Sequence, residues 1–330
     1  MHYNARTNQS DKNSGPLVVA FIGQDEPLRG DSKGAIGVAR QVAQMLGGRY
    51  EYVDAQSLSQ KFNQKSGYDA QLKAYAQQVA HVDIIIGNQS ADLSAHLRVK
   101  PLLEESRWNE AYSNARSNNG QGLVSHDLTD AALIDAGLVF RDKVKNIRGS
   151  LIGVMLGGAL ASGADTAVRK MSVMAERMGH DVTFYLCPSL RSGVMYERYM
   201  SYLKEMAKYS RINMQVIGED YATITAGYNP YHGLLDQADH LVVVGESGSL
   251  TSEALYTKKP LYMTQPPFMV DALISQGHII DLCDASHQVF RRASMPRIDV
   301  TAEVAYNIAE EYLDIRGMPQ RNDARGLQCL

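Results

Sequence analysis

Cysteine is scarce in this chain, with only Cys187, Cys283 and Cys329 among 330 residues. These positions match no metal-ligand spacing, and an odd, scattered set does not form a disulfide framework. The scarcity argues against a small disulfide-stapled secreted domain and favours a reducing, cytoplasmic setting.

Long apolar runs are also missing. No stretch approaches the ~18 consecutive apolar residues that a membrane span requires. Residues 1–15 are polar and lack the apolar core of a signal peptide, so they are expected to form a disordered tail. The sequence therefore predicts a cytoplasmic protein and leaves peripheral contact with the inner membrane open.

Positive charge is not in excess. A formal net charge of −3 argues against a dedicated nucleic-acid-binding protein, because such proteins are usually basic. A hydrophobic share of 45% beside 21% charged residues is ordinary for a soluble globular protein. Because 330 residues are many for one core, two domains of roughly 150 residues each are expected.

The common catalytic signatures are absent too. The chain has no nucleophile elbow, no catalytic triad pattern and no C-x-x-C pair. The phosphate-binding pattern G-x-x-x-x-G-K-[ST] is also missing. His126 and His278 each lack a second histidine at helical spacing, so no metal site is predicted.

What the chain does contain is an alternation of buried strands and helices. Such alternation predicts parallel βαβ units, whose ligands bind outside the carboxyl ends of the strands. We therefore predict an α/β fold with two doubly wound domains and a cleft between them. Strands are expected at residues 16–23, 50–53, 82–86, 150–156, 182–187, 213–217 and 241–244, and helices at 34–46, 126–136, 165–178, 198–209 and 302–315.

One segment has no regular pattern. Residues 104–122 are polar and rich in Asn and Ser, and most of them are expected to form a loop. Trp108, the only tryptophan, is expected to anchor this segment locally rather than to stack on a ligand.

The most informative stretch is residues 229–263, NPYHGLLDQADHLVVVGESGSLTSEALYTKKPLYM. Within it an apolar strand runs into the small-residue turn 245–249 and then into a helix. A strand–turn–helix of this kind points several backbone N–H groups at one place, a geometry that binds phosphates. It predicts a nucleotide-diphosphate pocket lined by Ser247, Gly248 and Ser249.

Glu253 follows this turn and is expected in the first turn of the helix. There its carboxylate can accept two hydrogen bonds from ribose hydroxyls, a role that acidic residues have in dinucleotide-binding folds. The alternative is that Glu253 only offsets the helix dipole. A capping box would place the acid three residues after the cap, whereas Glu253 lies four residues after Ser249.

Other residues in the second half of the chain are also candidates for ligand binding. Asn229 and Tyr231 belong to an Asn-Pro-Tyr turn that precedes it by one helix. Gly157 and Gly158 follow a buried strand, where they either admit a ligand or relieve crowding. Arg191 follows another strand and either binds a phosphate or is solvated.

In the first half of the chain, a strand-to-helix turn holds Gly30, Asp31, Lys33 and Gly34. Asp31 is a candidate general base, and Lys33 is a candidate contact for an anion. The alternative is that Asp31 or Ser32 caps the following helix.

Four segments together resemble the ELM1-like proteins, a family named for a plant mitochondrial-fission factor and found in bacteria as candidate glycosyltransferases. The segments are GDSKGAIGVARQVA (30–43), LIGVMLGG (151–158), the stretch 229–263 and FMVDALISQGHI (268–279), within a resemblance that extends over residues 17–315. The chain departs from the family in two places. It has Gly34-Ala35 where a Gly-His pair is usual, and Leu190-Arg191 where two arginines are usual.

The resemblance implies a GT-B architecture, with two facing Rossmann-like domains and a C-terminal helix that crosses back. It implies an N-terminal acceptor domain at 16–148, a nucleotide-sugar domain at 149–300, and a crossing helix and tail at 301–330. Carried over by position, the residues that line the diphosphate are Ser247, Gly248, Ser249 and Ser252, and the residue that holds the ribose is Glu253.

The leading hypothesis is a metal-independent glycosyltransferase that needs no cofactor, with a nucleotide-diphosphate sugar as donor and an unknown acceptor hydroxyl. Fixed N–H dipoles and Arg191 would stabilise negative charge on the leaving diphosphate, and Asp31 would activate the acceptor. Two other functions stay open. One is a non-catalytic adaptor, because plant relatives recruit a dynamin-like protein to mitochondria; the other is a nucleotide-sugar epimerase. The sequence determines neither the sugar nor the oligomeric state.

Overall fold

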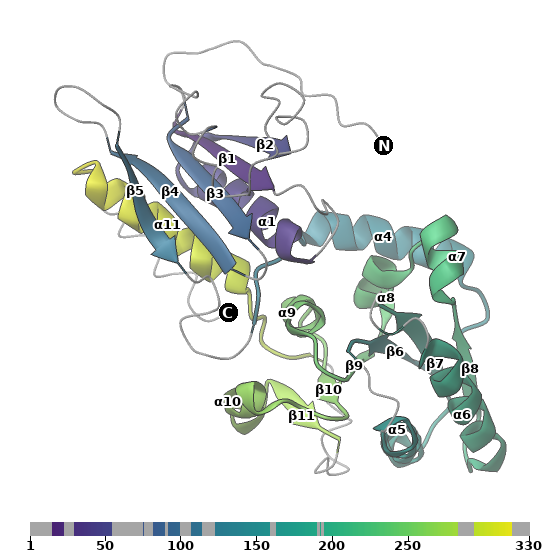
Figure 1. Cartoon of the computed structure of the whole chain (residues 1–330). Helices are drawn as coiled ribbons and strands as arrows, with labels where there is room; N and C mark the ends of the chain where they lie inside the picture. The colour runs from purple at the N-terminus through teal and green to yellow at the C-terminus, as the bar shows by residue number, and fades with distance from the viewer. Residues whose placement is uncertain are drawn as a thin grey trace. The chain divides into compact units, whose positions relative to one another are not determined.

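The computed structural model describes residues 15–22, 30–54, 75, 82–89, 92–99, 107–113, 123–158, 163–189, 192, 195–282 and 294–318. These residues divide into two compact units. Unit 1 contains the described residues before 117, together with 125–127 and 301–318, and unit 2 contains 123–124 and 128–300. Each unit has its own sheet and its own core (Figure 1), which confirms the predicted α/β class.

Unit 1 is built on a five-stranded sheet in the order β2-β1-β3-β4-β5. β1 (Leu17–Ile22) pairs in parallel with β2 (Arg49–Asp54) and with β3 (Ile84–Gln89). β4 (Asp92–Val99) and β5 (Arg107–Ser113) continue the sheet as antiparallel strands. This antiparallel part differs from the parallel units that we predicted. Only two residues separate β3 from β4, too few for the crossover that a parallel pair requires.

Within the described residues, α1 (Gly30–Met45) and α11 (Val300–Ile315) pack on the sheet of unit 1. Apolar side chains from β1, α1 and α11 form one buried cluster that includes Val18, Ala20, Val38, Val42, Val304 and Ile308. The C-terminal helix therefore returns to the unit that holds the first strand, as predicted, and Figure 1 shows α11 (yellow) alongside this sheet.

Unit 2 is built on a six-stranded sheet in the order β11-β10-β9-β6-β7-β8, and all of its strand pairs are parallel. Its strands are β6 (Ser150–Leu156), β7 (Val182–Pro188), β8 (Met214–Gly218), β9 (His240–Val244), β10 (Leu261–Met263) and β11 (Ile279–Asp281). Its helices are α4 (Asp130–Lys143), α5 (Ala164–Met178), α6 (Tyr196–Tyr209), α7 (Tyr221–Ala226), α8 (Tyr231–Gln237), α9 (Gly248–Tyr256), η3 (Phe268–Val270) and α10 (Asp271–Ser275).

Helices cover both faces of this sheet. Side chains of α5 and α6 belong to one buried cluster, and side chains of α4, α8 and α9 belong to another. Because a parallel sheet is buried on both faces, its strands are nearly continuous apolar runs. This is why the strands of unit 2 could be predicted from hydrophobicity.

Two predictions about elements were wrong. Most of 104–122 was predicted to be a loop, but residues 107–113 form β5; pairing with β4 overrides a composition that is poor for strands. The helix predicted at 126–136 instead occupies Asp130–Lys143. The residues before it are not helical. The His126 N–H donates to Thr301 Oγ1 at 2.8 Å, and Thr301 Oγ1 donates to the His126 carbonyl at 3.0 Å.

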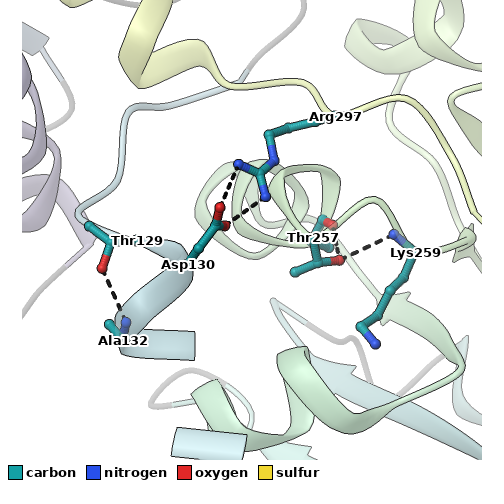
Figure 2. Close-up of polar contacts among 7 residues, drawn as sticks. Thr129, Asp130, Ala132, Thr257, Lys259 and Arg297 are labelled. Carbon is teal, nitrogen blue, oxygen red and sulfur yellow. Dashed lines mark hydrogen bonds and ion pairs between the residues drawn. The ribbon is translucent and has the colours of Figure 1, made fainter. Parts of the chain in front are cut away.

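An ion pair joins distant segments of unit 2 at the start of α4. Arg297 donates two hydrogen bonds to the Asp130 carboxylate, at 2.6 and 3.2 Å (Figure 2). The guanidinium also lies 4.2 Å from the centre of the Tyr256 ring, at the end of α9. Thr129 caps α4 beside this pair by accepting from the Ala132 N–H at 3.2 Å.

Asp130→Asn is expected to lower the free energy of unfolding by less than about 1 kcal/mol at neutral pH, because the Asp130 side chain is 61% exposed and exposed ion pairs are weak. The hydrogen bond from Arg297 lowers the pKa of Asp130 below its ordinary value of 3.8. The stabilisation is therefore present above 3.8 and is lost as the pH falls through the lowered pKa. Urea denaturation from pH 7 down to about pH 2 measures this, with Asp142→Asn as the control at a more exposed pair. If Asp130→Asn remains less stable than wild type by the same amount at low pH, the loss of stability does not come from this ion pair.

Candidate functional site

The candidate site begins at the turn between β9 and α9. Gly245 has a φ of 79°, a left-handed conformation that glycine adopts at little cost. Ser247 caps α9 by accepting from the Leu250 N–H at 3.3 Å. The Thr251 N–H makes the first bond within the helix, to the Ser247 carbonyl at 3.0 Å. The N–H groups of Gly248 and Ser249 therefore have no partner inside the helix and are available to a ligand at its N-terminus.

This turn lies where the order of strands in the sheet reverses. β6 and β9 are neighbours, but the chain leads from β6 to β7 and β8 on one side and from β9 to β10 and β11 on the other. The helices that follow the two strands, α5 and α9, pack into different clusters. Ligands of open α/β sheets bind outside the carboxyl ends of the strands at such a switch point.

The turn after β6 contacts the turn after β9. The Gly157 N–H donates to the Val244 carbonyl at 2.9 Å, and the Gly158 N–H donates to the Glu246 carbonyl at 3.1 Å. A Cβ atom on Gly157 would lie 3.0 Å from Cβ of Ser247. The two glycines thus let the turns approach each other, which is the crowding relief considered above, and their contact with a ligand stays a prediction.

Glu253 is the sixth residue of α9 and points into unit 2, where it is 4% exposed. The prediction that it stands in the first turn was wrong, because the helix begins at Gly248. A carboxylate interacts with the helix dipole mainly from the first turn. The alternative that Glu253 only offsets the dipole is therefore not supported. The Tyr231 hydroxyl donates to the Glu253 carboxylate. Burial, reinforced by the charge of Glu253, raises the pKa of Tyr231 well above its ordinary value, so the phenol is a hydrogen-bond donor at neutral pH.

Asn229 and Ser252 have structural partners. The Asn229 side chain accepts from the Tyr231 N–H at 3.0 Å, which fixes the turn that opens α8. Ser252 Oγ donates to the Gly248 carbonyl at 2.9 Å and accepts from the Val124 N–H at 2.8 Å. The contact of Ser252 with a diphosphate and that of Asn229 with a ligand stay predictions.

The candidates of unit 1 lie in the first turns of α1, which begins at Gly30. Because the helix already contains Asp31 and Ser32, neither is its N-cap, and that interpretation was wrong. Lys33 is half-buried. A Cβ atom on Gly34 would lie 2.9 Å from the Ser125 carbonyl oxygen, so the structure gives Gly34 a packing role.

Several residues singled out from the sequence lie away from this site or outside the described residues. Arg191 is outside the described residues, and of Asp31 and Trp108 only the backbone is described. His278 directly precedes β11, so it lies at the amino edge of the parallel sheet.

One side chain at the carboxyl edge was missed. Lys170, in α5, donates from Nζ to the carbonyl oxygen of Thr264, the residue after β10. Nothing in the sequence distinguishes Lys170 from its neighbour Arg169, because the contact joins residues 94 positions apart.

In the described part of the chain, no group of three or more His, Cys, Asp or Glu side chains is placed to hold a metal ion. The helices of that part include none with the length and apolar character needed to cross a membrane.

A known protein family matches the part of the chain that contains this candidate site. The profile of the family described as "Mitochondrial fission ELM1" matches residues 121–312, a range that contains β6 to β11 and the turn before α9. The chain belongs to this family. The ELM1 match therefore includes the switch point and Glu253. No protein with a curated description matches the chain.

Solved structures overlap the chain only loosely. UDP-GlcNAc 2-epimerase from Methanocaldococcus jannaschii has 10% identity and a TM-score of 0.48, covering 91% of this chain and 99% of its own. The S. aureus MnaA–UDP co-structure has 10% identity and a TM-score of 0.40, with coverages of 93% and 98%. UDP-GlcNAc 2-epimerase from Neisseria meningitidis bound to UDP-GlcNAc has 12% identity and a TM-score of 0.34, covering 56% of this chain and 48% of its own. Overlaps this loose carry no information about the ligand or the reaction of the ELM1-family chain.

Proposed function

We propose that this ELM1-family chain is a metal-independent glycosyltransferase. Its donor is a nucleotide-diphosphate sugar, bound at the carboxyl edge of the unit 2 sheet, and its acceptor is a hydroxyl group of unknown identity. The observation that carries the proposal is the start of α9 at the switch point, where the N–H groups of Gly248 and Ser249 have no partner inside the helix.

Backbone N–H groups at this place suit a reaction that expels a diphosphate. The N-terminus of a helix carries roughly half a positive charge, and negative charge grows on the diphosphate as the sugar leaves. Donors that are already oriented stabilise this charge without reorganising. The cap at Ser247 and the contact between the turns after β6 and β9 hold the donors in place.

Glu253 is proposed to hold the ribose. A carboxylate offers about four acceptor positions, so the hydrogen bond from Tyr231 does not exhaust its capacity. Tyr231 is proposed to orient the carboxylate. Asp31 stays the proposed base for the acceptor, and Arg191 stays a proposed cation for the leaving group.

Gly248→Pro is expected to weaken nucleoside diphosphate binding roughly tenfold, about the worth of one charge-assisted hydrogen bond. Proline has no N–H but is favoured at the first position of a helix. The preceding Ser247 already has the extended conformation, with φ −160° and ψ 105°, that a following proline requires. Thermal shift against a panel of nucleoside diphosphates and nucleotide sugars at roughly 1 mM measures binding to each.

Gly248→Ala is the matched control, because it adds a methyl group and keeps the N–H. Equal ligand-induced shifts for Gly248→Pro and wild type would remove this N–H from the site. If no nucleotide or nucleotide sugar raises the melting temperature of the wild type, the transferase proposal fails, and the adaptor hypothesis gains.

A further inference from the structure

A cationic side chain reaches the proposed diphosphate site from α5. This helix follows β6, so its N-terminus lies at the carboxyl edge of the sheet. Side chains of a helix lean toward its N-terminus, which brings the Lys170 ammonium back to that edge. There Nζ donates to the carbonyl oxygen of Thr264.

The residue that Lys170 contacts is adjacent to the phosphate turn. The Thr264 N–H donates to the Val243 carbonyl of β9 at 3.3 Å, and β9 runs directly into Gly245 and the start of α9. Neighbouring strands lie about 4.8 Å apart. Thr264 is thus about one strand spacing from β9, and the Lys170 ammonium contacts its carbonyl oxygen.

The charge of Lys170 lacks a counter-ion among the described residues. Their ion pairs join other residues, and none uses Lys170. An ammonium has three donors, of which the Thr264 carbonyl takes one. Partial burial removes some of the water that solvates a charge, and a paired anion offsets that cost.

A second polar group beside it is also without a partner. Thr264 is fully buried, and its Oγ1 has no hydrogen-bond partner among the described residues. Buried hydroxyls are normally satisfied, so an unpaired one beside an unpaired cation indicates that a polar group is to be bound there.

We infer that Lys170 binds the diphosphate of the donor and stabilises the negative charge that grows there when the sugar leaves. This inference rests on the proposed function, because it concerns the same site. It adds a second cation to Arg191, the cation proposed above for the leaving group, and both would act on the charge that develops on the diphosphate. Lys170 lies in α5, on the other face of the sheet from α9, so the phosphates are held from both sides of the switch point.

The test is isothermal titration of the full chain with inorganic pyrophosphate, a probe that contains the phosphates and neither base nor sugar. Lys170→Met is expected to weaken pyrophosphate binding by roughly 10- to 100-fold, the range for a hydrogen bond between charged groups. Arg169→Met makes the same change of charge one residue away on an exposed position of α5 and should leave the affinity unchanged. Lys170→Arg should restore most of the binding.

The outcomes separate the two proposals. If wild type binds pyrophosphate and Lys170→Met binds it equally well, Lys170 is not the cation, whereas the site at α9 stands. If Lys170→Met lowers the melting temperature and Lys170→Arg restores stability without restoring affinity, Lys170 only ties β10 to α5, and the inference is wrong. If wild type binds neither pyrophosphate nor any nucleotide, the proposed function and this inference fail together.

Discussion

Glu253→Gln is expected to weaken the binding of a nucleoside diphosphate roughly 100-fold and to leave the binding of inorganic pyrophosphate unchanged. The substitution removes the negative charge from the acceptor of two proposed ribose hydrogen bonds, a loss of about 3 kcal/mol. Pyrophosphate contains no ribose, so its affinity does not depend on this acceptor. Isothermal titration of wild type and variant, with pyrophosphate and with the nucleotide that gives the largest thermal shift, measures both effects.

The fold should survive this substitution, because the Tyr231 hydroxyl can donate to an amide oxygen as it donates to the carboxylate. Tyr231→Phe is the matched control. It keeps the carboxylate and removes a partner of a side chain that is 4% exposed, so it should lower the free energy of unfolding by about 1.5–3 kcal/mol. Wild type should also prefer the ribonucleotide to its 2′-deoxy form, and Glu253→Gln should not.

The opposite result for Glu253→Gln would be equally informative. If the variant binds the ribonucleotide as tightly as wild type, Glu253 serves only to join α9 to α8. The site would then hold phosphates without recognising the ribose, and the Glu253 assignment in the proposed function would be withdrawn.

Gly37→Ala is expected to lower the free energy of unfolding of unit 1 by about 3 kcal/mol or more, the upper range for overpacking. A Cβ atom at this position would lie 1.9 Å from the carbonyl oxygen of His126. That atom belongs to the backbone and cannot rotate away. Alanine is better than glycine inside a helix by about 1 kcal/mol, and this gain is too small to offset the clash. Urea denaturation followed by circular dichroism measures the loss.

Two other glycines calibrate this prediction. Gly34→Ala meets the Ser125 carbonyl oxygen at 2.9 Å, so its cost should be smaller than that of Gly37→Ala. Gly227→Ala, in unit 2, meets no atom closer than 3.8 Å, so its cost should come only from the backbone conformation of φ −157° and ψ −114° and should be smaller than that of Gly37→Ala. Equal stability of Gly37→Ala and wild type would mean that α1 and residues 125–127 are not packed backbone to backbone.

Hydrophobic runs predicted the strands of unit 2 well, because both faces of a parallel sheet are buried. The same signal was weak in unit 1 at β5, where the polar sequence 107–113 pairs with β4. It also misplaced α4, since His126 lies outside the helix and is hydrogen-bonded to Thr301, 175 positions away. α4 packs in unit 2, and a Cβ atom on Gly233 of α8 would meet Phe140 Cβ at 2.5 Å. No local pattern contains these contacts.

The sequence by itself determined the α/β class and the turn that begins at Gly245, because an apolar run followed by a cluster of Gly and Ser residues marks the end of a strand. The helix after the turn begins at Gly248, so the turn is shorter than the predicted 245–249. Only the tertiary structure decided what surrounds the turn. It placed the turn at a switch point by the order of the strands, paired Glu253 with Tyr231, and brought Lys170 to Thr264. These contacts join residues 22 and 94 positions apart, and such pairs depend on how strands and helices pack rather than on any nearby sequence signal.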